Sequence, residues 1–109
     1  MRWAPNIYTT DNTAAKKRRI MKKAMRGQSL AGIYFVSLSS NRKDLFDVFN
    51  ASQLLQDAYV WKDPYIVGIA EDRGAAFELV RVIVDDIYRK TGGFDVESYF
   101  KPGRGGVMR

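Results

Sequence analysis

The sequence predicts a small α+β domain, in which a mainly antiparallel sheet of three or four strands carries a long amphipathic helix, about 72–91, on one face. Two apolar runs, "IYFV" and "YIVGIA", are rich in strand-forming residues and bounded by turn signals. The stretch 72–91 instead repeats apolar residues at helical spacing. A second, basic helix is predicted over about 13–26, and 109 residues fit one domain.

The N-terminal residues combine a short strand with the basic helix. "NIYTT" favours a strand, although an irregular arm that docks Trp3 is the alternative. Asp11, Asn12 or Thr13 is expected to cap the helix, and a glycine at 27 to end it. One arc is apolar and consists of Ala14, Ile20, Met21, Ala24 and Met25. Cations that repel one another fill the opposite arc, so the helix must dock on the body, a second chain or an acidic partner.

The central residues predict a hairpin followed by a short helix. Residues 33–36 form a central strand, a polar turn follows at 41–44, and 45–51 form the second strand. A helix over 43–57 is the competing interpretation of this second strand. "NASQ", 50–53, has the pattern of a capping box, with Ser52 as an alternative cap for a short helix. The hairpin aromatics are expected in the core rather than on a base-stacking platform: Tyr34, Phe35, Phe46 and Phe49.

A third buried strand and the long helix complete the predicted domain. Residues 65–70 form the strand, in which Gly68 marks a bulge or a close backbone approach. Asp72 is the candidate N-cap of the helix, and a glycine at 92 or 93 ends it. Its apolar face is predicted to contain Ala76, Phe77, Val80, Ile83, Val84, Ile87 and Tyr88. "GFDVESYF" is expected to add a short terminal strand.

Charge divides the chain into three parts. Residues 1–27, a basic arm and helix, carry a net charge of +7; residues 28–100, the compact core, carry −4; and the flexible tail, 101–109, carries +3. A basic segment attached to an acidic body is typical of an interaction element, although it can also fold back on that body. The tail contains "GRGG", a single copy of an element that binds RNA when it is repeated.

The composition removes most catalytic chemistry. The chain has no histidine and no cysteine, which excludes the commonest general base, thiolate nucleophiles and Cys/His zinc sites. Asp85 and Asp86 are adjacent in a helix and therefore point roughly 100° apart rather than toward one ion. We therefore expect no enzyme, no cofactor and no metal site; the one enzymatic alternative is a metal-dependent carboxylate site.

The basic helix gives the main functional hypothesis, which is a non-enzymatic nucleic-acid-associated protein of accessory or regulatory type. Its expected phosphate contacts are Lys16, Arg18, Arg19, Lys22, Lys23, Arg26 and Arg104. The alternative is a protein-binding module, an inhibitor or an assembly subunit, whose basic helix docks on an acidic protein through Ile20, Met21 and Met25. An anionic membrane surface fits less well, because the apolar arc has no aromatic anchor.

Location and assembly follow from weaker patterns. No apolar run reaches the roughly 20 residues that a transmembrane helix needs. We expect a cytoplasmic protein, although residues 1–27 also have the composition of a mitochondrial transit peptide. A half-exposed sheet edge offers a route to a homodimer, which would double the basic surface.

Overall fold

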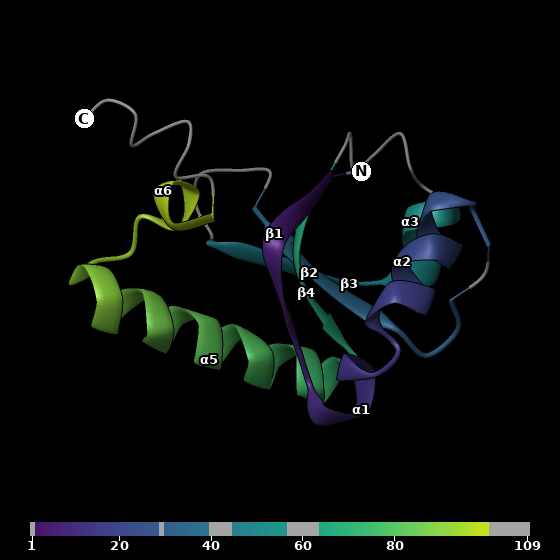
Figure 1. Cartoon of the computed structure of the whole chain (residues 1–109), viewed down its shortest axis with the longest axis horizontal. Coiled ribbons are helices and arrows are strands. Elements are labelled where there is room, and N and C mark those ends of the chain that lie inside the picture. The colour runs from purple at the N-terminus through teal and green to yellow at the C-terminus, as the bar shows by residue number, and fades with distance from the viewer. Residues whose placement is uncertain (1, 29, 40–44, 57–63, 101–109) are drawn as a thin grey trace.

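The computed structural model describes residues 2–28, 30–39, 45–56 and 64–100, and its chain forms a four-stranded sheet with helices on both sides (Figure 1). The elements in chain order are β1 (Arg2–Thr9), α1 (Asp11–Ala14), α2 (Lys17–Met25), β2 (Tyr34–Leu38), β3 (Phe46–Asn50), α3 (Ala51–Gln56), β4 (Tyr65–Ala70), α5 (Arg73–Thr91) and α6 (Val96–Phe100). The predicted α+β class is confirmed.

The strand order in the sheet is β1-β4-β2-β3. β2 pairs antiparallel with both β3 and β4, whereas β1 joins β4 in parallel, so the sheet is mixed but mainly antiparallel. The N-terminal residues are therefore a strand rather than an irregular arm. The hairpin of β2 and β3 is confirmed, and the helix over 43–57 is wrong for the described residues before 51; the turn at 41–44 lies outside the described residues.

β4 is buried from Ile66 to Ala70 and contributes side chains to the hydrophobic clusters on both faces of the sheet. Val67 and Gly68 both face α5, because the register with β2 shifts between Val36 and Ser37. A Cβ atom at Gly68 would lie 3.0 Å from Leu79 Cδ2 and 3.2 Å from Val36 Cβ. The glycine therefore marks both a bulge and a close approach between sheet and helix, as predicted.

Each face of the sheet has its own hydrophobic cluster. Under α5 lie the side chains of Val36, Leu38, Val67, Ala76, Leu79, Ile83 and Ile87. On the opposite face, α2 covers a cluster that contains Phe35, Phe49, Ile66 and Ile69. The strand runs are apolar throughout because both faces are covered. The hairpin aromatics belong to the core as expected: Phe35 and Phe49 are buried, and Tyr34 and Phe46 are half-buried against it.

α5 begins and ends where its local signals predict. The Asp72 side chain accepts a hydrogen bond of 2.7 Å from the Ala75 N–H, and Gly92 closes the helix with φ of 77°. The predicted apolar face is wrong in part, because Leu79 is buried while Phe77 and Tyr88 are about half exposed. A helix on a sheet buries only the arc around one line of contact, and Leu79 lies on the far side of that line from Phe77 and Tyr88.

The predicted single helix over 13–26 is two helices, α1 and α2, separated by a turn at 15–16 (Figure 1). The buried Thr13 Oγ1 donates to the Ile69 carbonyl (3.0 Å), which fixes α1 at the end of β4. The residue at the N-cap position of α1 is Thr10 rather than one of the three predicted, and its hydroxyl donates to Glu71. Hydrogen bonds from Thr10 and Asn12 lower the pKa of the Glu71 carboxyl.

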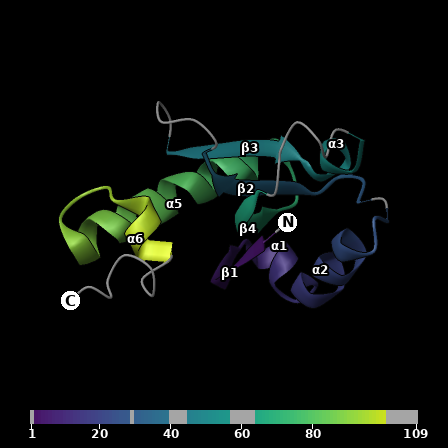
Figure 2. The same cartoon turned by 90° about the horizontal axis from the view of Figure 1, so that it is seen from above.

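The predicted terminal strand, "GFDVESYF", is wrong, because its second half forms helix α6. Asp95 accepts hydrogen bonds from the Ser98 N–H and hydroxyl, which starts the helix. Phe100 is then buried in the α5-side cluster, and its carbonyl accepts from the Tyr65 hydroxyl (3.1 Å). Viewed from above, α6 lies beside the C-terminal half of α5 (Figure 2). The tail 101–109 lies outside the described residues.

Candidate anion-binding surface

α2 is held on the sheet by a narrow apolar stripe. Ile20 and Ala24 are 4% and 5% exposed and pack into the cluster around Phe35. Met21 is half-buried against the same cluster, but Met25 is 65% exposed. The predicted five-residue apolar arc is therefore wider than the buried stripe. The stripe nevertheless fixes the rotation of the helix, and this rotation turns the remaining side chains toward solvent.

The cations of α2 and its flanks occupy that outward side. Six are exposed, and Lys17, the one cation next to the apolar stripe, is half-buried; the exposed six are Lys16, Arg18, Arg19, Lys22, Lys23 and Arg26. Within the described parts of the chain, no carboxylate forms an ion pair with any of the seven. α5, which carries acidic residues, covers the opposite face of the sheet from α2 (Figure 1). The positive charge therefore remains available to an anionic partner.

Part of this surface is concave. Lys16, Arg19 and Lys23 recur at intervals of three and four residues, which places them along one side of the helix. They line a depression of about 320 Å³ together with Ile20, Leu30, Ala31 and Ile33. We call this the α2 depression. It combines three cations with an apolar wall, so it can hold an anion that also carries an apolar or planar group.

The charges of α2 do not stabilise the helix that carries them. Its first turn contains Lys17, Arg18 and Arg19 and no acid, although the positive end of the helix dipole favours acidic residues there. The side chain of Lys16, at the N-cap position, makes no capping hydrogen bond. Like charges three and four residues apart add further repulsion. Sites that break local stability rules in this way are often functional ones.

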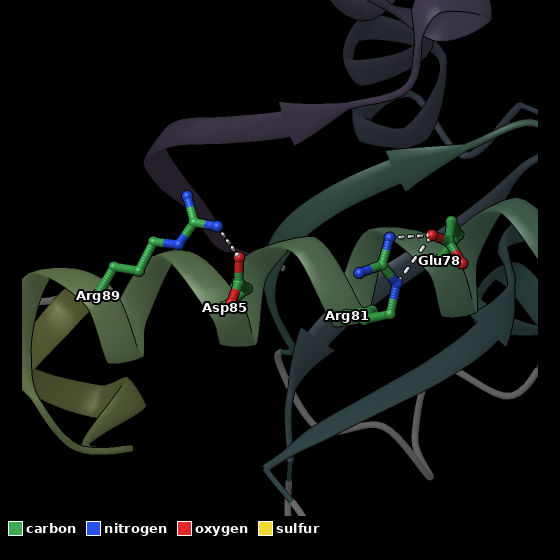
Figure 3. A network of polar contacts seen from close by, with 4 residues as sticks. All are labelled: Glu78, Arg81, Asp85 and Arg89. Carbon is green, nitrogen blue, oxygen red and sulfur yellow. Dashed lines mark hydrogen bonds and ion pairs between the residues drawn. The ribbon is translucent and has the colours of Figure 1, made fainter.

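Other sequence candidates have structural explanations in the described residues. Asp85 pairs with Arg89, and Asp86 accepts from Tyr8, so the two carboxylates diverge as expected (Figure 3 shows the Asp85 pair). Among the residues that the structure describes, no three acidic side chains gather to hold a metal ion. Arg104, the remaining predicted contact, lies outside the described residues.

Two features were not found by sequence reasoning. The first is the wall of the α2 depression, which the turn at 30–33 brings beside the helix. The second is a chain of polar groups between β1, α5 and α6. Tyr8 donates to Asp86 (3.0 Å) and lies 2.9 Å from the Tyr99 hydroxyl, to which Lys90 donates (3.3 Å). Burial, together with the hydrogen bonds to Tyr99 and Asp86, raises the pKa of the Tyr8 phenol. Tyr8 and Tyr99 lie 91 residues apart, so no local pattern signals this contact.

Comparison of the chain with protein-family models, with curated proteins and with solved structures finds no match. In the part of the chain that the structure describes, no helix is both long enough and apolar enough to cross a bilayer.

Proposed function

We propose that this protein is a non-enzymatic, cytoplasmic nucleic-acid-associated protein that binds the phosphate backbone through α2. The observation that carries the proposal is the outward cationic side of α2, whose side chains make no ion pair with a described carboxylate. Each phosphate that such a side chain neutralises releases condensed counterions, which gives affinity without sequence specificity. The Tyr8 contact to Asp86 and the Arg89 contact to Asp85 give both carboxylates structural roles.

The dimensions of α2 suit a phosphate backbone. From Lys16 to Arg26 the helix and its caps rise about 15 Å, since each helical residue adds about 1.5 Å. One strand of a duplex advances about 3.4 Å per phosphate, so this length faces about four phosphates. Three arginines can bind phosphate oxygens through two N–H groups at once, and four lysines act as point charges.

An acidic protein partner is favoured less by the burial pattern. Docking α2 in the groove of another protein needs an apolar face, and Ile20 is already buried in the chain's own core. Of the three predicted anchors, only Met25 is largely exposed, and its sulfur accepts a hydrogen bond from the Trp3 indole (3.3 Å). The surface that α2 offers is therefore cationic rather than amphipathic, and a polyanion needs only the charge.

The proposal is tested by binding of labelled duplex and single-stranded oligonucleotides, measured by fluorescence anisotropy over a salt series. Arg19→Gln with Lys23→Gln removes two charges from the α2 depression. Arg73→Gln with Lys90→Gln removes the same charge from α5 and serves as the matched control. On duplex DNA the first pair is expected to lower the slope of log K against log salt by about 1.8, and the control pair to leave it nearly unchanged.

Two results would overturn the proposal. One is the absence of binding at low salt, and the other is an equal loss of affinity in both pairs of variants. Affinity purification before and after nuclease treatment addresses the alternative. A single stoichiometric protein that survives nuclease treatment would replace the nucleic acid with an acidic protein as the partner of α2.

A further inference from the structure

α5 carries a second apolar stripe that the sheet does not cover. Phe77, Tyr88 and Phe94 are 51%, 53% and 52% exposed, and Val84 lies between the first two on the same side of the helix. The Tyr88 and Phe94 rings stack with their centroids 5.3 Å apart and 22° between their planes. Exposed aromatic groups of this size, close together on one surface, are typical of protein–protein contacts.

The residues along this stripe have the same sequence of spacings whether they are counted from the N-terminal or the C-terminal end of α5. Phe77, Val84 and Tyr88, together with Arg81 at the edge of the stripe, are separated by four, three and four residues in the order 77, 81, 84 and 88. A second copy of α5 that runs antiparallel therefore presents matching positions, with Phe77 level with Tyr88 of the second copy and Arg81 level with Val84. We propose that the protein forms a homodimer in which two α5 helices pack antiparallel about a two-fold axis through the middle of this stripe.

The charges beside the stripe fit the same arrangement. Along one flank the order of signs is negative, positive, negative, positive, from Glu78, Arg81, Asp85 and Arg89 (Figure 3). Reversing this order, as an antiparallel partner does, places an acid opposite each base. In this register Asp85 of the second copy is level with Val80, the residue before Arg81, and Arg89 of the second copy is level with Ala76, two residues before Glu78. A helical residue rises about 1.5 Å, so each acid and base is within reach of the other. In a parallel pair with two-fold symmetry, this flank of one helix lies on the opposite side of the contact from the same flank of the other, so these charges do not meet. The charge pattern therefore favours the antiparallel orientation.

The shape of the surface provides a place for the aromatic ring of the partner. Arg81, Val84, Asp85, Tyr88 and Phe94 line a depression of about 420 Å³. In the antiparallel pair, Phe77 of each copy lies beside this depression of the other. Such reciprocal insertion of an aromatic side chain into a pocket is a common form of binding hot spot. The contact does not depend on nucleic acid, and because α5 and α2 lie on opposite sides of the sheet, both α2 surfaces remain exposed in the dimer.

The dimer is tested by sedimentation equilibrium of the full chain without nucleic acid, over a concentration series. Tyr88→Ser is expected to weaken association by about tenfold or more, because it removes a half-exposed aromatic group that lines the depression beside Phe77 of the second copy. Val82→Ser is the matched control, since Val82 is 39% exposed on the same helix but lies off the stripe. Circular dichroism checks that both variants remain folded.

A charge exchange tests the orientation. Arg81→Glu alone and Asp85→Arg alone each place like charges across the axis, and both variants are expected to associate more weakly. Mixing the two variants restores opposite charges at both positions, so the mixture is expected to dimerise again. A wild-type chain that stays monomeric, an equal effect of Tyr88→Ser and Val82→Ser, or a mixture that does not associate would overturn the proposal. None of these outcomes bears on phosphate binding by α2, which anisotropy measures separately.

Discussion

The two faces of the sheet are covered by helices of opposite character. α5 has 19 residues, a side-chain cap at Asp72, a glycine at its C-terminus and four buried side chains. Its Glu78 and Asp85 form ion pairs with arginines one turn further along the helix (Figure 3). α2 has nine residues, no side-chain cap, two buried side chains and cations without a described ionic partner.

The two helices therefore contribute differently: α5 adds stability, and α2 adds exposed positive charge. Capping at both ends, ion pairs along the helix and burial against the sheet all stabilise α5. α2 is too short and too highly charged to be stable in isolation, and packing of Ile20 and Ala24 on the sheet must hold it in place. The domain thus uses its core to display a cationic helix that would not form alone. Substitutions on the two faces should therefore differ in how far their effects spread.

The largest effect is expected for Ile83→Ala, under α5. Ile83 is fully buried, and its truncation should lower the free energy of unfolding by about 2–5 kcal/mol, measured by urea denaturation. Ile20→Ala, under α2, should cost about 2 kcal/mol, at the lower end of this range, because a short helix can shift to fill the space. Amide exchange of α2 should also rise in this variant before global unfolding. Equal costs without a local rise in exchange would contradict the comparison.

An intermediate effect is expected for Gly68→Ala, where Leu79 of α5 packs closely on the sheet. The added methyl group would lie 3.0 Å from Leu79 and 3.2 Å from Val36, so overpacking should cost about 1–3 kcal/mol of unfolding free energy. Gly93→Ala is the control, because among the described residues no atom beyond the glycine and its two chain neighbours lies within 4 Å of its added methyl group. Thermal or urea denaturation of both variants measures the difference. An unchanged stability of Gly68→Ala would mean that α5 packs more loosely than its burial indicates.

The same division explains which parts of the fold could be predicted from the sequence. β4 and α5 were predicted within one or two residues, because an apolar run, the Asp72 cap and Gly92 are local signals. The break between α1 and α2 accompanies a hydrogen bond from Thr13 to Ile69, 56 residues away, and the parallel pairing of β1 with β4 joins similarly distant segments. Contacts of that range leave no periodic pattern in the chain.

The candidate site shows the same limit. Its cations were predicted individually, because the basic stretch and its helical spacing are visible in the sequence. The α2 depression was not predicted, since its wall depends on where the turn at 30–33 lies in the folded domain. In α6 a cap signal was present, because Asp95 precedes Ser98 by three residues, but the segment was predicted as a strand.

The smallest effect on stability is expected for Arg18→Glu, which should raise the free energy of unfolding and lower the affinity for nucleic acid. An acidic residue in the first turn of α2 interacts favourably with the positive end of the helix dipole and with Lys22 four residues later. The free energy of unfolding should therefore rise by about 0.3–1 kcal/mol at low salt. The gain should shrink as salt screens these charges. Affinity for oligonucleotides should fall, because the change removes one phosphate contact and adds a repulsive charge.

Lys22→Glu is the matched control for this last prediction. It makes the same change of charge in the last turn of α2, where the dipole favours cations, so it should weaken binding and also lower stability. Urea denaturation and anisotropy on the same two proteins measure both quantities. If both variants gain stability equally, the effect comes from net charge alone. If Arg18→Glu gains stability and keeps its affinity, the exposed cations of α2 are not the surface that contacts phosphate.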